Sequence, residues 1–246
     1  MSSADQFNTV SRIDDVFATF ADPSVGGRQL ELAAGATVFE QGADAGHVYF
    51  IQRGQVRLYQ QGPDGASRLL EILGAGQWFG CASLSESRQF HAKAVAVGRT
   101  VLTQTPVANL LDAVSQSPKA AVQLIKQLAD SVQAAREDSA RLVFDDCNGR
   151  LIKTLVRFSR SAAATPHDDG VVLHITHEQL AQAVGVARET VSLALTEMRL
   201  KNLVRTGRNQ LTFNPAALEQ FAARCNGNGN GNGNGTSREI REEVAA

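Results

Sequence analysis

Short apolar runs, each followed by glycine, recur between about Leu30 and Pro106. The runs read TVFEQG, VYFIQRG, VRLYQQGPDG, LLEILGAG, WFGCASL and AVAVG. Strands of about four to eight residues, separated by turn signals at regular intervals, are typical of antiparallel β-structure. Within this stretch, QGPDGA supplies residues that favour the backbone angles of a hairpin turn. The pattern predicts an antiparallel β-sandwich or β-roll over residues 28–106.

The hydrophobic period becomes that of a helix after residue 107. Apolar or small residues follow one another at steps of three and four, which is the spacing of a heptad seam. They are Ile125, Leu128, Val132, Ala135, Ser139 and Leu142. A second apolar side, which includes Val122 and Leu124, is available to pack on the β-structure, so the seam predicts a parallel homodimer. Packing of the seam itself on the β-structure is the alternative.

The polar segment DDCNGR, residues 145–150, interrupts the helical pattern and predicts a hinge between two domains. Beyond it, the pattern predicts a helix over 150–163, a polar loop over 165–170 and a short strand over 171–175. The stretch LVRTGRNQLTF, residues 203–213, reads as two short strands around a basic turn, which is the wing of a winged helix.

The two ends of the chain carry little pattern. Residues 1–27 are assigned as a helical lead-in to the β-structure. Residues 226–246 contain an Asn-Gly repeat of low complexity, which has no means of forming a core and predicts disorder.

The segment ITHEQLAQAVGVARETVSLALTEM, residues 175–198, has the spacing of a helix-turn-helix. Ala181 allows the two helices to cross closely, Gly185 falls in the turn four residues later, and Val191 lies six residues beyond the glycine. Because a predicted wing follows, the segment is interpreted as a DNA-reading unit. An ordinary helical hairpin inside a core is the alternative.

A projection of the second helix at about 100° per residue separates two faces. Val191, Ala194, Leu195 and Met198 share the side expected to face the core. The opposite side carries the candidate base-reading residues, which are Arg188, Glu189, Ser192 and Leu193.

These side chains differ in the DNA edges that they can recognise. Arg188 suits guanine O6 and N7, Glu189 suits cytosine N4, and Ser192 suits a base or a phosphate. Leu193 cannot hydrogen-bond, so its expected contact is a thymine methyl group. Thr176, Arg205 and Arg208 are candidate phosphate contacts, which set register without reading sequence.

Charge, hydropathy and cysteine content each add a constraint. The net charge is −1, yet residues 150–225 carry ten Lys and Arg against six Asp and Glu, as a DNA-binding segment requires. There is neither a long apolar run nor a secretory leader, so we expect a cytoplasmic protein that does not enter a membrane. Cys81, Cys147 and Cys225 lack metal-ligand spacing, so no metal site is predicted. A redox role for Cys81 or Cys147 is the alternative to small buried groups.

Several motifs in the same order resemble the Crp/Fnr superfamily of bacterial transcription regulators. LAAGATVFEQGADAGHVYFIQRGQVRLY is similar to the first half of its cyclic-nucleotide-binding β-roll, and GQWFG to the start of its phosphate-binding cassette. NGRLIKTLVRFSR is similar to its first C-terminal helix, and ARETVSLALTEMRLKNLV to its recognition helix. The resemblance covers roughly residues 28–222.

The resemblance implies an α+β fold. It consists of an antiparallel β-roll of the double-stranded β-helix, cyclic-nucleotide-binding-like type at 28–106, a dimerisation helix region at 107–145 and a winged helix-turn-helix at 146–225. It also implies a regulator that is not an enzyme and that binds double-stranded DNA as a homodimer. By position, the 165–170 loop resembles the family's contact with RNA polymerase, and a solvated loop is the alternative.

The cassette departs from the cyclic-AMP-binding pattern of the family. Where that pattern has Gly-Glu and then Arg-Ser, the corresponding positions here are Gly80 and Cys81, then Phe90 and His91. Two hydroxyl residues that hold the adenine correspond to Ala135 and Arg136. Loss of the guanidinium removes a bidentate bond to the cyclic phosphate, so cyclic AMP is not expected as a ligand.

Two further functional hypotheses remain open. In the first, a different anionic effector, such as another cyclic nucleotide or a dinucleotide, binds near Arg88, His91, Lys93 or Arg136 and controls the hinge at 145–149. In the second, the β-roll is a cupin-like enzyme, although His47 and His91 stand alone without clustered ligands. No cofactor is predicted.

Two departures concern DNA. Leu193 stands where most of the family places an arginine that bonds a guanine of the half-site. Ala187 stands where a serine often caps the recognition helix. The expected half-site therefore differs from the family's usual one, whereas the docking geometry does not.

Overall fold

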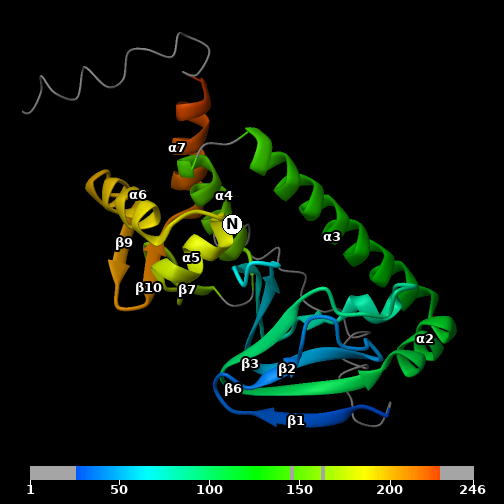
Figure 1. Cartoon of the computed structure of the whole chain (residues 1–246). Helices are drawn as coiled ribbons and strands as arrows, with labels where there is room; N and C mark the ends of the chain where they lie inside the picture. The colour runs from blue at the N-terminus through cyan, green and yellow to red at the C-terminus, as the bar shows by residue number, and fades with distance from the viewer. Residues whose placement is uncertain (1–25, 145–146, 162–163, 228–246) are drawn as a thin grey trace, which may run out of the picture.

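The computed structural model describes residues 26–144, 147–161 and 164–227. A β-roll and a second, mainly helical part lie at opposite ends of the long helix α3 (Figure 1). The predicted lead-in at 1–25 and the predicted disorder beyond 227 lie outside the described residues. No helix in the described ranges is long and apolar enough to cross a membrane.

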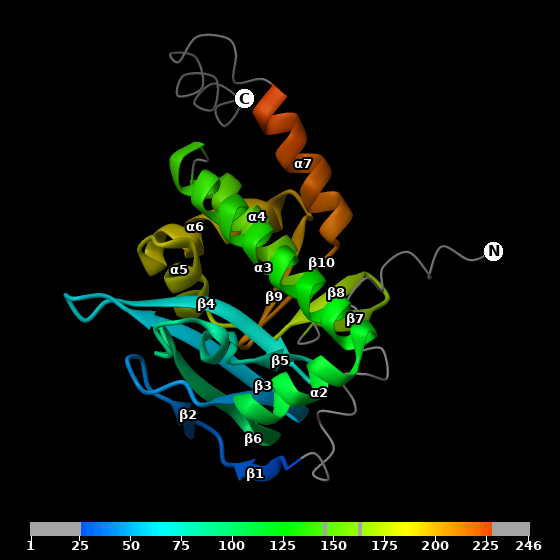
Figure 2. The same ribbon diagram turned by 90° about the vertical axis from the view of Figure 1, so that its right-hand side faces the viewer.

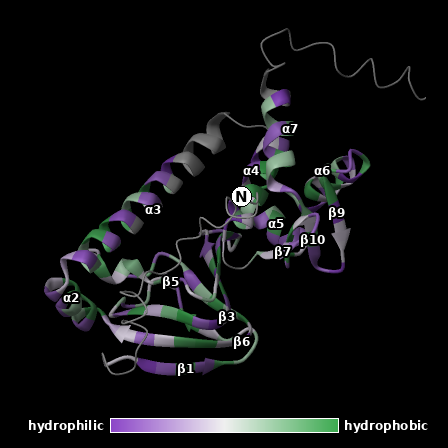
Figure 3. Cartoon of the chain, turned by 180° about the vertical axis from the view of Figure 1, so that it is seen from behind, coloured by the Kyte–Doolittle hydropathy of each residue, from purple (hydrophilic) through white to green (hydrophobic). Residues whose placement is uncertain are grey.

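The β-roll is antiparallel, as the glycine-punctuated pattern predicts. Its strands are β1 (Arg28–Leu32), β2 (Thr37–Phe39), β3 (His47–Gln61), β4 (Ser67–Gly74), β5 (Trp78–Phe79) and β6 (Lys93–Pro106). They hydrogen-bond in the order β1-β6-β3-β4, with β2 paired to β6 and β5 paired to β3. The edge strand β1 is largely hydrophilic, whereas β3 and β6 contain apolar stretches (Figure 3).

The prediction of only short strands is wrong for β3 and β6, which have 15 and 14 residues. The glycine that separates VYFIQR from VRLYQ does not end a strand. Gly54 has a φ of 93°, and the register of β3 against β6 shifts on both sides of Arg53. The glycine therefore permits an irregularity that bends one continuous strand, because this backbone conformation has no steric cost without a side chain.

The predicted hairpin turn joins β3 to β4. Gly62 donates its amide hydrogen to the carbonyl of Ala66 at 2.8 Å. Ala66 in turn donates to Oδ1 of Asp64 at 3.1 Å. These bonds close the turn that QGPDGA predicts.

Four aromatic side chains fill the interior of the β-roll. Phe90 stacks on Phe39 with ring centroids 3.6 Å apart and an angle of 9° between the planes. Tyr49 and Phe79 stack with centroids 5.2 Å apart. Leu30, Ile51, Val56 and Leu102 belong to the same apolar cluster. The interior is thus a packed core, which stabilises the roll by removing apolar surface from water.

Helices α2 (Val107–Gln116) and α3 (Pro118–Phe144) follow the roll. Leu124 packs beside Val48 of the roll and Leu110 of α2, so one side of α3 is covered by the chain itself. Val122, Ile125 and Val132 have exposed fractions of 51%, 65% and 51%. Ile125 and Val132 belong to the predicted seam. The prediction that Val122 packs on the roll is wrong, and Leu128 of the predicted seam packs instead against the cluster that contains Leu124.

The C-terminal part is a winged helix. It contains α4 (Cys147–Ser159), β7 (Thr165–His167), β8 (Gly170–Leu173), α5 (His177–Val184), α6 (Arg188–Leu200), β9 (Val204–Gly207), β10 (Gln210–Phe213) and α7 (Pro215–Gly227). The four strands form a sheet in the order β7-β8-β10-β9. The hairpin of β9 and β10 is the predicted wing.

Four local predictions need correction. The helix predicted at 150–163 spans Cys147–Ser159, so most of the predicted hinge at 145–150 is helical. The predicted loop at 165–170 contains β7 and the turn to β8, because Thr165, Pro166 and His167 pair with β8. The strand predicted at 171–175 ends at Leu173. Helix α7 was not predicted, although Asn214 accepts hydrogen bonds from the amides of the first helical turn.

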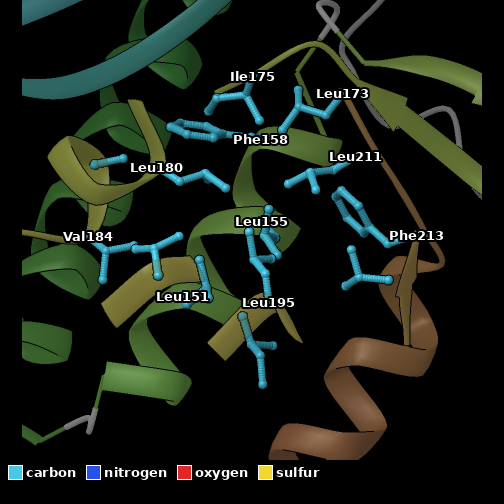
Figure 4. Close-up of a cluster of buried hydrophobic side chains, with 14 of the residues drawn as sticks. Leu151, Leu155, Phe158, Leu173, Ile175, Leu180, Val184, Leu195, Leu211 and Phe213 are labelled. Carbon is cyan, nitrogen blue, oxygen red and sulfur yellow. The ribbon is translucent and has the colours of Figure 1, made fainter. Parts of the chain in front are cut away.

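The core of the winged helix includes residues from the β-roll. Leu151, Leu155, Leu180, Leu195 and Leu211 converge from α4, α5, α6 and β10 (Figure 4). Leu69 and Ile72 of strand β4 belong to the same cluster. Helix α5 lies over β4 (Figure 2). One apolar core therefore extends from the roll into the DNA-reading part.

Candidate nucleic-acid interface

The two helices of the predicted helix-turn-helix begin differently. Thr176 caps α5: its hydroxyl accepts from the amide of Gln179 at 3.1 Å, and the Gln179 side chain accepts from the amide of Thr176 at 3.0 Å. The N-cap of α6 is Ala187, which offers no side-chain hydrogen bond. The missing cap predicted from the sequence is therefore confirmed, and the first amides of α6 have no side-chain cap.

Gly185 makes the turn between the helices. Its φ of 76° is left-handed, and its amide donates to the carbonyl of Ala181 at 2.8 Å. The amide of Val186 donates to the same carbonyl at 3.1 Å. The backbone carbonyl at the end of α5 is thus satisfied where the chain changes direction, as glycine in this position allows.

Helix α6 has the two faces predicted by its period. Val191, Ala194, Leu195 and Met198 are buried in the core. Arg188, Glu189 and Thr196 are exposed on the other side. Leu193 is 69% exposed. A large apolar side chain is therefore presented to solvent on the face that is expected to meet DNA.

Ser192 is less free than its neighbours. Its hydroxyl donates to the carbonyl of Arg188 at 3.0 Å, within α6. The same oxygen lies 2.9 Å from Nδ1 of His177, the first residue of α5. This contact ties the two helices of the motif together. The sequence alone does not single out His177, because only the fold brings the start of α5 next to this turn of α6.

The predicted phosphate contacts lie at two places. Arg208 is exposed at the tip of the wing, next to Asn209, whose φ is 57°. Arg205 on β9 is exposed but forms an ion pair with Asp169 of the β7–β8 turn. Thr176 is half-buried and acts as the cap of α5. A DNA phosphate would therefore compete with Asp169 for Arg205, whereas Arg208 has no such competitor in the described residues.

The residues predicted to bind an effector differ in their exposure to solvent. Gly80 and Phe90 are buried, whereas Cys81, Arg88 and His91 are exposed. Lys93 forms an ion pair with Glu40 at 2.9 Å. Phe90, which stands where the family pattern has an arginine, lies in the aromatic core. Ala135 and Arg136 are exposed on α3 in the single chain.

The two described cysteines differ in their surroundings. Cys81 begins a short 3-10 helix, η3 (Cys81–Leu84). Although the residue as a whole is exposed, partial burial of the thiol raises the pKa of Cys81, and the nearby Glu71 carboxylate raises that pKa further. A raised pKa lowers the thiolate fraction and with it the reactivity at neutral pH. Cys147 is half-buried at the start of α4.

A second residue that the sequence did not single out is Arg57. It lies on β3 of the roll and is only 7% exposed. Its Nη2 donates to the backbone carbonyl of His174, just before α5, at 2.7 Å. Strand alternation places Arg57 on the outer side of the roll, but no local pattern indicates that the winged helix covers this side.

A winged helix-turn-helix attached to a β-roll by a long helix is the architecture of a DNA-binding transcription regulator. Comparison with known families supports this class of protein. The family described as Cyclic nucleotide-binding domain matches residues 29–117. The family described as Crp-like helix-turn-helix domain matches residues 149–221. The chain belongs to the Crp/Fnr family of transcription regulators.

Curated relatives are regulators rather than enzymes. The chain is 28% identical to the cAMP-activated global transcriptional regulator CRP of Haemophilus influenzae over 172 residues, which cover 70% of this chain and 77% of that protein. It is also 28% identical to the CRP-like cAMP-activated global transcriptional regulator of Mycobacterium tuberculosis over 180 residues, which cover 72% of this chain and 79% of that protein.

Solved structures agree on the fold. FixK2 from Bradyrhizobium japonicum has a TM-score of 0.68 at 19% identity, over 79% of this chain and 96% of that one. The c-di-GMP-responsive global regulator CLP of Xanthomonas campestris has a TM-score of 0.65 at 22% identity, over 81% of this chain and 98% of that one.

Proposed function

We propose that the chain is a homodimeric regulator that recognises a pseudo-palindromic DNA site and does so without cyclic AMP. The observation that carries the proposal is the outward face of α6, where Arg188, Glu189 and Leu193 are exposed above a basic wing. In such dimers, the two recognition helices enter major grooves about 34–36 Å apart.

Base reading is assigned to the exposed residues of α6. Arg188 donates to guanine O6 and N7, and Glu189 accepts from cytosine N4. Leu193 contacts a thymine methyl group, the apolar feature of the major groove. Ser192 keeps an acceptor lone pair for a base or phosphate, although its hydrogen atom is directed to the carbonyl of Arg188.

Phosphate contacts are assigned to Arg208, Arg205 and Thr176. Arg208 is exposed at the tip of the wing. Arg205 must leave Asp169 to reach DNA, but exposed ion pairs are worth only about 0–1 kcal/mol, so the exchange costs little. Contacts of this kind hold the register of the protein and carry no sequence information.

The dimer is supported by the exposed apolar side of α3. Ile125 and Val132, seven residues apart, are more than half exposed. Exposed apolar residues at heptad spacing are stabilised when a second helix covers them. The proposed seam consists of Ile125, Leu128, Val132, Ala135, Ser139 and Leu142.

Independence of cyclic AMP is supported by the interior of the roll. Phe90 is 3% exposed and stacks on Phe39. A phenyl ring cannot replace the charge-assisted bonds that an anionic phosphate requires. Arg88 and His91, on either side of Phe90, are exposed rather than turned into the core. The residues present do not fit the cyclic phosphate.

A regulator gated by a different effector is the second candidate. The hydroxyl of Ser83, in η3, is buried and has no hydrogen-bond partner in the described part of the chain. An unsatisfied buried hydroxyl is unfavourable, and a polar ligand would satisfy it. The relatives named above as activated by cAMP or responsive to c-di-GMP favour the same candidate.

The β7–β8 hairpin is the proposed contact with RNA polymerase. Thr165, Pro166, His167, Asp168 and Asp169 are all exposed on it. The pairing of β7 with β8 gives this segment a regular backbone, which suits a protein contact better than the loop expected from the sequence.

Selection of bound sequences from random double-stranded DNA tests the proposal. The purified protein is used without nucleotide, and then with cyclic mono- and dinucleotides. We expect a palindromic site without nucleotide, and a weakening of about tenfold to a hundredfold for Arg188→Ala at the guanine that it contacts.

Each alternative result assigns a different function. Enrichment only in the presence of one nucleotide would establish the effector-gated candidate in place of the proposal. Enrichment of no sequence under any condition would contradict sequence-specific recognition altogether.

A further inference from the structure

The winged helix packs on the outer side of strands β3 and β4. Arg57 and Ile72 are direct cross-strand partners, and so are Tyr59 and Leu69. The register shifts between Leu58 and Tyr59, so β4 carries one extra residue. This bulge brings Leu69 and Ile72, three residues apart, to the same side of the sheet.

Where this side meets the winged helix, apolar residues surround Arg57. Leu69 is fully buried, and Ile72 is 2% exposed. Both lie in one cluster with Ile175 and Leu180 of the winged helix, and Tyr59 packs against it. Figure 4 shows Ile175 and Leu180 at the edge of this cluster, where α5 begins. Arg57 is thus a guanidinium at an apolar contact between two parts of the protein.

A hydrogen bond across this contact joins Arg57 to the backbone that enters α5. Nη2 of Arg57 donates to the carbonyl of His174 at 2.7 Å, between residues 117 apart in the chain. His174 is followed by Ile175, which is buried, and by Thr176, the cap of α5. The bond therefore holds the backbone at the point from which the recognition unit starts.

Burial of the Arg57 guanidinium is energetically unfavourable, so a contribution to stability does not explain why an arginine stands here. Its Nε is buried and has no hydrogen-bond partner in the described residues. Replacement of a buried charge by an apolar side chain of similar volume is often neutral or stabilising. A buried polar group in an apolar contact can instead fix how the two packed parts are oriented. Only one orientation of the two parts lets the polar group form its hydrogen bond.

We infer that Arg57 is a positioning residue, which fixes the orientation of the winged helix on the β-roll and thereby the spacing of the two half-sites that a dimer accepts. The inference rests on the proposed function. Helix α3 and the roll pack together, so a winged helix fixed on the roll is also fixed relative to the dimer axis. The half-site sequence is read by α6 and does not involve Arg57.

The first test measures orientation without DNA. Spin labels are placed at Gln60→Cys, on the roll, and at Thr206→Cys, on the wing, after the three native cysteines are replaced by serine. Labelled protein is diluted with unlabelled protein, so that distances within one chain dominate. We expect a narrow distance distribution by pulsed electron spin resonance, and a clearly broader one for Arg57→Met.

The second test measures spacing. Affinities are determined for palindromes whose half-sites are one or two base pairs closer or farther apart than in the selected site. We expect Arg57→Met to lower the discrimination against wrong spacings by about tenfold, which corresponds to one charge-assisted hydrogen bond, with the half-site preference unchanged. Arg53→Met, on the same strand but exposed, is the matched control and should behave as the parent protein.

The two readouts separate the inference from the proposed function. A parent protein that selects no palindrome would overturn both the proposed function and the role in spacing, while the distance measurement still reports whether Arg57 holds the two parts together. Unchanged spacing discrimination in Arg57→Met would overturn the inference, whether or not the distances broaden. If Arg57→Met does not fold, the same two measurements are made on Arg57→Lys. We expect a partial broadening of the distances and a partial loss of spacing discrimination. Full retention of both would contradict the inference.

Discussion

Phe90 and Leu193 are two apolar residues at positions where the family pattern has arginine, and their surroundings are opposite. Phe90 is 3% exposed and stacks on Phe39 inside the β-roll. Leu193 is 69% exposed on the outer face of α6. An apolar side chain therefore completes an interior in one region and forms an exposed apolar surface in the other.

The difference indicates which region needs a partner. The aromatic core around Phe90 is complete within the chain, so its stabilisation comes from folding itself. The surface at Leu193 gains nothing from folding, because its side chain stays in water. Its apolar area is removed from water only when another molecule, in our proposal the major groove, covers it.

The largest expected effect is on the filled interior. Phe90→Ala should lower the free energy of unfolding by about 3–5 kcal/mol, because it removes a buried ring and leaves a cavity. Urea denaturation followed by circular dichroism measures the change. The selected half-site should not change in the fraction that remains folded.

Leu193→Ala is the matched control for this comparison. Its effect on the free energy of unfolding should stay within about 0.5 kcal/mol, as is usual for exposed positions. A loss similar to that of Phe90→Ala would show that Leu193 packs in a core, and would remove the contrast between the two regions.

The next effect concerns DNA sequence. Leu193→Arg should shift the preferred half-site towards guanine at the position that Leu193 contacts, by about tenfold to a hundredfold, because a bidentate arginine–guanine pair is worth about 1–3 kcal/mol. Competition binding with a panel of half-site substitutions measures this shift. An unaltered preference would mean that Leu193 does not face the groove.

The smallest effect concerns the start of α6. Ala187→Ser should raise the free energy of unfolding by about 1 kcal/mol, because a serine hydroxyl can accept from an uncapped amide of the first turn. Thermal or urea unfolding of the variant and of the parent protein measures the change. Equal stability of Ala187→Ser and the parent protein would contradict an unused cap.

The helix-turn-helix was predictable because its signal is local. Gly185 adopts the left-handed turn, and a period of 3.6 residues separates Val191 from Leu193. The β-roll was predictable as a class, but not the continuity of β3, since the sequence does not distinguish a glycine that ends a strand from one that bends it.

Contacts between distant parts could not be predicted in this way. Arg57 reads as an ordinary outward residue of a strand, and its partner at His174 is 117 residues away. The contact of Ser192 with His177 likewise depends on how two helices cross. Helix α7 is not evident from the sequence, because LEQFAARCNG runs directly into the low-complexity Asn-Gly repeat.

The shared core at β4 also bears on how the protein unfolds. Leu69 and Ile72 of the β-roll are buried in the core of the winged helix. A fragment that begins at α4 would therefore lack two side chains of its own core. The first matched family ends at residue 117 and the second begins at residue 149. These boundaries therefore do not divide the chain into two parts that unfold independently. The roll and the reading unit should melt in a single transition, and a DNA-binding fragment should be less stable than the same residues in the whole chain.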